Sequence, residues 1–327
     1  MSSETLSEQQ VQQLAEQTRQ LVEQIRRVVV GQDEVIRETV VALIAAGHVL
    51  IEGLPGLGKT LLARSISQAV GGEFSRVQFT PDLMPADISG HAMFDLKSES
   101  FRIRRGPVFC NFLLGDEINR APAKTQAALL EAMQEAQVTI EGKSFELSPP
   151  FLVMATQNPI EQEGTYPLPQ AQLDRFLLNV FIDYPSHEQE IELVGRVTGN
   201  AVGDQLNLAP VEQVLTVEQV HGLQQAAAQV FVDPAIVDYV VRIVRASRDW
   251  HGVEVGAGPR ASIALLRAAR AQAIYNGNAF VTPDDVKAIV LPALRHRVQL
   301  SAALEIEGRR VDEVLHSIVD AVEAPRT

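Results

Sequence analysis

Hydrophobic positions in the first half of the chain alternate between helical and strand-like spacing. Residues 5–30 repeat apolar side chains every three to four positions, which predicts one amphipathic helix, and Gly31 turns the chain into a second helix expected to end near Gly47. Short apolar runs bounded by turn residues, each typical of a buried strand, are Val49–Ile51, Val77–Phe79, Phe109–Leu114, Phe151–Ala155 and Leu177–Ile182. Helical stretches such as Thr60–Val70 and Ala123–Gln134 separate them, so we expect a layered α/β fold with a parallel sheet.

From residue 185 onward the pattern is helical only. Thr216 and Gln219 form a capping box at the start of one of these helices. Helices are expected at 186–198, 217–230, 234–248, 260–275, 283–291 and 309–322. We therefore expect two domains, an α/β domain over residues 1–184 and a helical domain over residues 185–327.

A glycine-rich loop between the first strand and the next helix carries the strongest chemical signal. Residues 53–60 read GLPGLGKT, the full G-x-x-x-x-G-K-[ST] pattern. Its backbone N–H groups can wrap a phosphate, Lys59 neutralises the β- and γ-phosphates, and the Thr60 hydroxyl binds Mg²⁺. A chance glycine loop is the alternative, which the strand–loop–helix context disfavours. The residues expected to hold the nucleotide are Gly53, Pro55, Gly56, Leu57, Gly58, Lys59, Thr60 and Leu61.

Two adjacent carboxylates, Asp116 and Glu117, follow the third apolar run. A buried strand would deliver both to the carboxyl edge of the sheet, beside the phosphate loop. Asp116 is expected to hold Mg²⁺, largely through water. Glu117 is expected to take a proton from the attacking water, because a metal-bound carboxylate is a poor base. An acid that caps the following helix is the alternative.

The next strand ends in polar residues that include Asn158. An amide at this tip can orient the attacking water and contact the γ-phosphate of a nucleotide. The alternative is a polar turn before Pro159 with no chemical role.

Taken together, these motifs resemble the MoxR family of AAA+ ATPases. The strings that carry the likeness are GLPGLGKT, LLGDEINRA, ATQNP, LPQAQLDRF and GPRAS, and the likeness runs from about Val29 to about Leu300. Departures are small: Cys110 and Gly115 stand where alanine is expected, and Gln170 where glutamate is usual. The resemblance implies an AAA+ P-loop NTPase core, a parallel sheet flanked by helices with insert hairpins, followed by an all-helical lid. It also implies ATP and Mg²⁺ as cofactors.

The resemblance assigns catalytic roles to three residues beside Glu117. Asn158 matches sensor 1, Arg175 matches the arginine finger that reaches the neighbouring subunit's site, and Arg260 matches sensor 2 on the lid. For Arg175, a salt bridge to Asp174 or a surface charge is the alternative. For Arg260, the alternative is a solvated arginine in the first turn of a helix. This alternative is disfavoured because a cation at a helix N-terminus interacts unfavourably with the helix dipole, at a cost of ~0.3–1 kcal/mol.

Two short alternating segments predict inserted hairpins. One includes Phe101–Arg104, and the other pairs Val138–Ile140 with Phe145–Leu147. The resemblance identifies them as the helix-2 insert and the presensor-1 hairpin, which approach the pore or a partner in related rings. The arginines of the first hairpin could grip an anionic segment, but an exposed strand face is the favoured interpretation. By the same resemblance, Asn119 and Arg120 are candidates for a contact between subunits.

Composition and charge narrow the partner classes. Apolar residues make up 46% and charged residues 21%, which excludes disorder for most of the chain, and the net charge of −13 disfavours a polyanionic partner. The single cysteine, Cys110, is expected in a buried strand, and most of the seven histidines are expected on the surface, without zinc-ligand spacing. No signal peptide and no apolar run of ~20 residues is visible, so a cytoplasmic location without membrane insertion is expected.

Three function classes remain. The resemblance favours a chaperone-like ATPase that assembles or activates partner complexes as a ring. It implies a hexameric homo-oligomer, a protein client and a von Willebrand factor A-domain partner. A nucleic-acid motor of the helicase or branch-migration type is the alternative, against which the net charge and the lack of a winged-helix or zinc module argue. The third class is a nucleotide-gated scaffold, which binds ATP but barely hydrolyses it. The presence of Lys59, Asp116, Glu117 and Arg175 disfavours this class.

Overall fold

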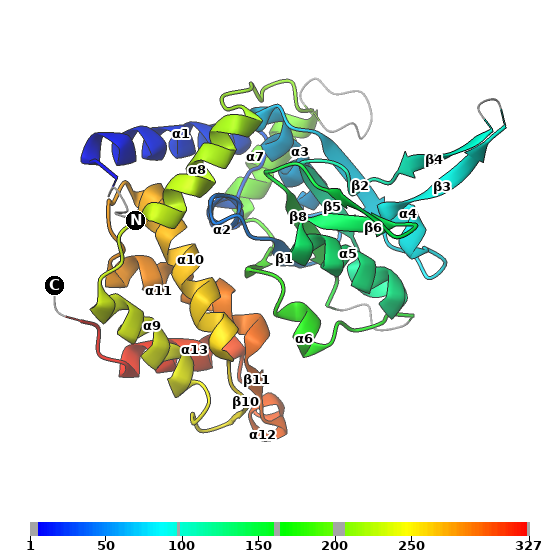
Figure 1. Cartoon of the computed structure of the whole chain (residues 1–327). Coiled ribbons are helices and arrows are strands. Elements are labelled where there is room, and N and C mark those ends of the chain that lie inside the picture. Colours follow the sequence, from blue (N-terminus) through cyan, green and yellow to red (C-terminus); the bar gives the residue numbers. More distant parts are fainter. Residues whose placement is uncertain (1–5, 97–98, 160–163, 199–206, 326–327) are drawn as a thin grey trace.

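A five-stranded parallel sheet lies at the centre of the computed structural model, which describes residues 6–96, 99–159, 164–198 and 207–325 (Figure 1). The strand order is β2–β5–β8–β1–β9. The strands are β1 (Val49–Glu52), β2 (Phe74–Gln78), β5 (Phe112–Asp116), β8 (Leu152–Gln157) and β9 (Leu178–Phe181). The predicted α/β core with a parallel sheet is therefore confirmed.

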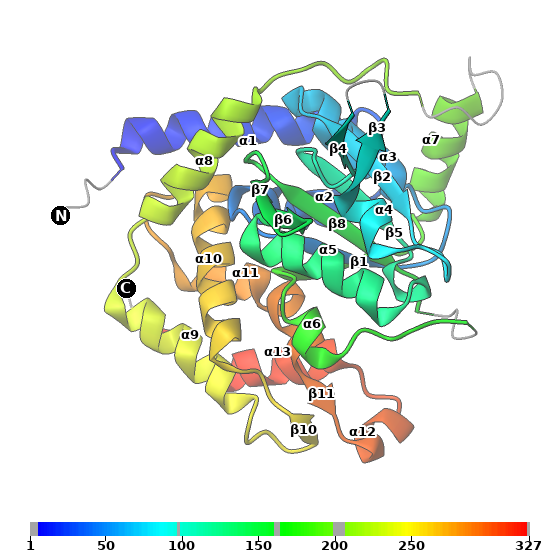
Figure 2. The ribbon, with the colours of Figure 1, turned by 45° about the vertical axis from the view of Figure 1, so that its right-hand side comes forward.

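Helices cover both faces of the sheet, which explains why its central strands are apolar up to their carboxyl ends. Along β1, Val49 and Ile51 belong to the hydrophobic core on one face, and Leu50 belongs to the core on the other. The first face carries α1 (Glu8–Arg26), α2 (Asp33–Ile44) and α3 (Lys59–Val70), and the second carries α5 (Ala123–Glu135) (Figure 2). This layering leaves the ends of the strands as the place where polar side chains can gather.

The strand register brings polar residues together at the carboxyl edge of the sheet. Gln78 on β2 is paired with Asp116 on β5, and Glu52 on β1 is paired with Gln157 on β8. Gly115 is paired with Ala155, so Thr156 follows beside Asp116. The phosphate loop leaves β1 at the same edge, which places it beside the carboxylates.

After β9 the chain is mostly helical. Its helices are α7 (His187–Thr198), α8 (Val217–Gln229), α9 (Pro234–Ala246), α10 (Pro259–Asn276), α11 (Pro283–Leu294), the 3-10 helix η2 (Arg295–Arg297), α12 (Ala302–Ile306) and α13 (Val311–Ala321). In the lid, α10 packs against α8, α9 and α11, and it also contacts α1 and α2. One continuous hydrophobic core therefore joins the lid to one face of the sheet. The division into domains at residues 184 and 185 stays a prediction.

Both predicted hairpins are present as antiparallel pairs. β3 (Gly90–Asp95) pairs with β4 (Ser100–Arg105) and projects from the body of the molecule after the short helix α4 (Pro85–Ser89) (Figure 1). β6 (Gln137–Ile140) pairs with β7 (Lys143–Glu146), and Val138 stands opposite Phe145. Sequence patterning had indicated only the second strand of the first hairpin, because β3 lacks a clean alternation.

Some helices begin or end at other residues than expected, because a capping interaction or tertiary packing fixes the terminal residue. The helix expected over 5–30 begins after Ser7, which forms a capping box with Gln10; residue 5 lies outside the described residues. The second helix ends before Gly47 because Ala46 adopts a left-handed turn. The helix expected over 283–291 continues through Pro292 to the start of η2. Smaller shifts of one or two residues occur at most other ends.

Some strand expectations are wrong in position. The strand expected at Phe109–Leu114 begins only at Phe112, because Cys110 N donates to Val108 O at 2.9 Å in a turn. Cys110 is thus buried in this turn and not in a strand. The edge strand β2 begins at Phe74 instead of Val77, because its polar residues still pair with β5.

Several small features were not expected. The helix α6 (Gln170–Leu173) and the pair β10 (Val253–Val255) with β11 (Gln299–Leu300) carry no clear periodicity. Two histidines are buried, unlike the others: His48 bonds Met133 O and Val153 N, and His296 bonds Phe176 O. Among the described residues, no helix is both long and apolar enough to cross a bilayer.

Candidate nucleotide-binding and catalytic site

The phosphate loop joins the carboxyl end of β1 to the first turn of α3. Gly58 is the N-cap of α3 and has a φ of +84°, which favours glycine. Gly53 lies so close to Ile182 that an added Cβ would be 2.4 Å from its carbonyl oxygen. These two glycines let the loop curl around the free N–H groups at the start of α3, where a phosphate is stabilised by the helix dipole.

A cavity of about 380 Å³ lies between this loop and the carboxyl ends of β2, β5 and β8. Predicted residues on its wall are Pro55, Gly56, Gly58, Lys59, Thr60, Leu61, Asp116, Glu117 and Asn158. Sequence reasoning missed Arg76, Gln78 and Thr156, which share the wall. Gly53 and Leu57 lie beside this cavity: Gly53 O accepts a hydrogen bond from Lys59, and Leu57 lines a neighbouring apolar cavity.

Lys59 is placed to neutralise negative charge in the cavity. Its Nζ donates to Gly53 O across the loop. Partial burial lowers the pKa of Lys59, whereas the nearby carboxylates of Asp116, Glu117 and Glu52 raise it. A partly desolvated ammonium favours a ligand that brings negative charge, such as a polyphosphate, and a metal ion bound with that ligand would offset the nearby carboxylates.

Both carboxylate oxygens of Asp116 are engaged. Thr156 Oγ1 donates to Asp116 Oδ1 at 2.8 Å, and Arg76 donates to Oδ2 from Nε at 2.9 Å and from Nη2 at 2.6 Å. Arg76 and Thr156 come from the two strands that flank β5, so their role depends on sheet register. This register is not readable from one sequence, which is why both residues were missed.

The donor set on this wall fits a hard divalent cation. The Thr60 hydroxyl and the Asp116 carboxylate line the same cavity and both offer oxygen. Mg²⁺ usually binds proteins through one or two such oxygens together with substrate phosphates and water. An ion bound to Asp116 Oδ2 would compete with Arg76 for that oxygen.

Glu117 is held at the edge of the cavity by its backbone and by side chains. It adopts a left-handed conformation with φ 57°, and its N–H donates to Thr156 Oγ1 at 3.0 Å. Its Oε2 accepts from Gln78 Nε2 at 2.8 Å and lies 3.0 Å from Arg120 Nε. Asn158, which is buried, lines the same cavity. A carboxylate and an amide thus face the space where the end of a polyphosphate would lie.

We expect Thr156→Val to destabilise the fold, because it removes the hydroxyl shared by Asp116 and the Glu117 backbone. An N–H group left without a partner costs ~1–3 kcal/mol. The free energy of unfolding from urea titration should fall by about this amount. The matched control is Thr39→Val: Thr39 is equally buried, but its hydroxyl only donates to Val35 O within α2. Equal losses for the two variants would contradict the assigned role.

A second cavity of about 390 Å³ continues from the other side of the loop and is apolar. It shares Gly56, Gly58 and Leu61 with the first cavity. The rest of its wall comes from the segment after α1 and from α7, including Val29, Pro185 and Leu193. An apolar slot beside a phosphate site is suited to a flat nucleobase. Of this wall, sequence reasoning placed at the site only the loop and first-turn residues Gly56, Leu57, Gly58 and Leu61.

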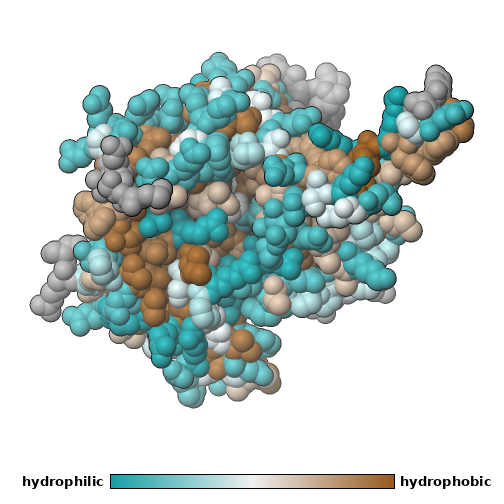
Figure 3. All heavy atoms as spheres, in the orientation of Figure 1, coloured by the Kyte–Doolittle hydropathy of each residue, from teal (hydrophilic) through white to brown (hydrophobic). Residues whose placement is uncertain are grey.

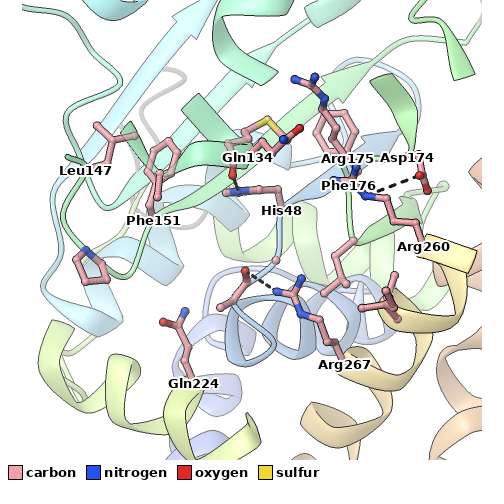
Figure 4. Close-up of a pocket in the computed structure, with 18 of the residues that line it drawn as sticks. His48, Gln134, Leu147, Phe151, Asp174, Arg175, Phe176, Gln224, Arg260 and Arg267 are labelled. Carbon is pink, nitrogen blue, oxygen red and sulfur yellow. Dashed lines mark hydrogen bonds and ion pairs between the residues drawn. The ribbon is translucent and has the colours of Figure 1, made fainter. Parts of the chain in front are cut away.

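Arg175 and Arg260 do not reach the phosphate-loop cavity. They line a third cavity of about 560 Å³ between the core and the lid (Figure 4). Asp174 lies 2.6 Å from Arg297 Nε and 3.7 Å from Arg260 Nε. The alternative that Arg175 pairs with Asp174 is therefore wrong, and Figure 4 shows the Arg175 guanidinium pointing away from that carboxylate. In the described part of the chain, no ion pair of Arg175 is present.

Arg260 is not simply a solvated first-turn arginine either. It stands in the first turn of α10, where its side chain is half exposed and approaches Asp174. The structure thus brings the phosphate loop, the two acids and Asn158 together, and it brings the two arginines together at a different place.

Comparison with known proteins agrees with this architecture. Residues 48–178 match the model of ATPases associated with various cellular activities, and residues 245–318 match the AAA lid domain. Chaperone MoxR1 of Mycobacterium tuberculosis is 44% identical over 314 residues, covering 92% of this chain and 80% of that protein. Protein MoxR of Methylorubrum extorquens is 31% identical, covering 91% and 92%.

A solved structure shows the same fold. The crystal structure of a proposed ATPase from Cytophaga hutchinsonii superposes with a TM-score of 0.88 at 36% identity, and the match covers 97% of each chain. The sequence relatives and this structure span both the core and the lid. The chain therefore belongs to the MoxR family of AAA+ ATPases.

Proposed function

We propose that the chain binds ATP with Mg²⁺ in the phosphate-loop cavity and hydrolyses it. The observation that carries this proposal is the shared cavity of the loop, Asp116 and Glu117. In it, Lys59 and Thr60 hold phosphates and metal, Asp116 holds the metal, and Glu117 takes a proton from water. Asn158 orients that water. When bound, Mg²⁺ would neutralise phosphate charge, and Thr60 and Asp116 would hold it.

We propose further that the active site is completed by a neighbouring subunit. Arg175 and Arg260 line a cavity apart from the one that contains Lys59. A cation that stabilises transferring phosphoryl groups must contact them, so these two arginines serve a neighbour's nucleotide. This geometry supports a head-to-tail homo-oligomer, for which we propose a closed hexameric ring.

The projecting hairpin supports a protein client. Its exposed apolar side chains are Met93, Phe94, Leu96 and Phe101, and Figure 3 shows apolar atoms along the lower side of the projecting hairpin. Exposed apolar groups of this kind mark protein-binding surfaces. We propose that a ring of such hairpins acts on proteins in a chaperone-like way. A von Willebrand factor A-domain partner and a cytoplasmic location belong to the same proposal.

Two observations disfavour a nucleic-acid motor. The net charge is −13, and in the hairpin Arg102 lies 3.0 Å from Asp95. Binding of duplex or single-stranded DNA with a salt slope of several units would contradict the preference for a protein client.

We expect Lys59→Ala to weaken ATP binding by roughly 10- to 100-fold, because a charge-assisted contact worth about 1.5–3 kcal/mol is lost. Calorimetric titration with Mg-ATP measures this change, and ATP turnover should disappear with it. Lys287→Ala is the control, since Lys287 is exposed on α11 in the lid. Unchanged affinity of the Lys59 variant would contradict the assignment of the phosphate loop.

A further inference from the structure

The segment that carries Arg175 is held by one buried arginine from the lid, Arg297 of η2. Arg297 is 4% exposed. Its Nε donates to Asp174 Oδ1 at 2.6 Å, and its Nη2 donates to Asp174 O at 3.2 Å and to Phe176 O at 2.6 Å. Its Nη1 donates to Leu177 O at 3.1 Å and to Ala293 O. All the N–H groups of a guanidinium are thereby used, and most of them bind residues 174–177.

His296 of η2 reinforces this attachment. Its Nε2 lies 3.1 Å from Phe176 O, whereas Arg295 Nη1 donates to Asn179 O at 3.2 Å in β9, outside residues 174–177. The side chain of Phe176 is fully buried beside this turn. The lid therefore contacts the backbone on both sides of Arg175, while the Arg175 side chain itself points away from Asp174 (Figure 4).

A purely packing role does not account for this arrangement. Burying a guanidinium is costly, and an apolar side chain of similar size would stabilise a core at least as well. A planar fork of donors, in contrast, fixes the direction of several carbonyl groups at once. Such a fork is suited to holding a short irregular segment in a single conformation. The residue in the middle of that segment is Arg175.

We propose that Arg297 is a positioning residue for Arg175, which it holds in the orientation needed to reach the nucleotide of the neighbouring subunit. The inference rests on the proposed role of Arg175 in trans. The inference adds that the position of Arg175 is set by the lid of its own subunit. Movement of that lid then alters ATP hydrolysis in the neighbouring subunit, while the phosphate-loop cavity of the subunit that contributes Arg175 stays intact.

Two variants test the positioning role. Arg297→Met removes both the charge and the planar set of guanidinium donors, whereas Arg297→Lys keeps the charge and loses the planar set of donors. We expect Arg297→Met to bind ATP normally and to lower turnover by about 100-fold, the effect of a misplacement of about 1 Å. Arg297→Lys should recover part of the rate. If Arg297→Met does not fold by circular dichroism, Arg297→Lys and Asp174→Asn carry the test.

The matched control is Asp312→Asn. It weakens a comparable pair, in which Arg295 Nη2 lies 3.1 Å from Asp312 Oδ2 with side-chain exposures of 8% and 20%. That pair joins η2 to α13 and does not touch residues 174–177. We expect this variant to lose stability, because it breaks a buried pair, but to keep its turnover within about twofold of the unmodified chain while it is folded, because Asp312 does not bond residues 174–177. An equal loss in the control would mean that Arg297 acts only by holding the lid together.

Mixed assemblies give the decisive readout. If Arg297 acts through Arg175, Arg297→Met should regain activity when mixed with Glu117→Gln, whose subunits donate an intact finger. It should regain none when mixed with Arg175→Ala, because both subunits then donate a defective finger. If Arg297 only supports its own subunit's nucleotide site, the pattern is reversed, and this result would overturn the inference.

A reference mixture of Arg175→Ala with Glu117→Gln separates two kinds of failure. If activity recovers in the reference mixture but Arg297→Met shows the reversed pattern, only the positioning role of Arg297 is rejected, and the trans role of Arg175 stands. No recovery in the reference, with co-assembly shown by native mass spectrometry, rejects the trans role of Arg175 and the inference with it.

Discussion

Arg175→Ala should lower ATP turnover by ~10³–10⁵-fold while ATP affinity stays close to that of the unmodified chain. The side chain lies outside the cavity that contains Lys59, so its removal leaves the nucleotide contacts of its own subunit intact. In the proposed function, the lost cation offsets negative charge on the transferring phosphoryl group of the neighbour. Steady-state turnover and calorimetric titration with Mg-ATP measure the two quantities separately.

Arg19→Ala serves as the control for the loss of an arginine. Arg19 is exposed on α1 and only pairs with Glu16 one turn away. Its removal should leave turnover unchanged. A decrease of less than about tenfold for Arg175→Ala, far below the range of an arginine finger, would show that Arg175 does not take part in the chemistry.

Glu117→Gln is expected to lower turnover by 10²- to 10⁴-fold, roughly the contribution of a general base. The amide keeps the shape of the side chain, and its oxygen can still accept the hydrogen bond from Gln78. ATP should therefore remain bound without being hydrolysed. Single-turnover measurements with radiolabelled ATP report the chemical step directly.

A suitable control is Glu131→Gln, because Glu131 is exposed on α5 and lies outside the cavity. If Glu117→Gln retains turnover within about tenfold of the unmodified chain, another group must accept the proton. A scaffold that binds ATP without turnover would show no difference between the two variants, since neither would change an activity that is absent.

Much of the core could be predicted from the sequence because its signals are local. The apolar runs that correspond to β1, β5 and β8 are buried on both faces of the sheet. Such runs predict buried strands without any knowledge of which strands lie beside them. The carboxyl ends of parallel strands meet at one edge, which placed Asp116 beside the phosphate loop. Start signals such as the capping box at Thr216 located the lid helices.

The features that were missed depend on contacts between segments distant in the sequence. Arg76 and Thr156 act on Asp116 only because β2 and β8 flank β5 in a particular register. The apolar cavity is closed by Val29 and Leu193, which are far apart along the chain. The first strand of the projecting hairpin has too few alternating residues to be recognised. No single-sequence pattern records such pairings.

Arg260 illustrates the same point for the candidate site. Its motif identified it as a catalytic residue, but its position depends on how the lid packs against the core. In the structure it lies beside Asp174 and Arg175 and away from Lys59. This is the reason for assigning both arginines to a neighbour's nucleotide.

The central claim, that each active site is shared between two subunits, is tested most directly by mixing Arg175→Ala with Glu117→Gln. Each variant alone should be inactive. In an equal mixture about one quarter of the interfaces combine an intact Glu117 with a neighbour's intact Arg175, so about a quarter of the activity should return. It should also rise with protein concentration as assembly proceeds. Absence of any recovery in verified mixed assemblies would contradict the shared site.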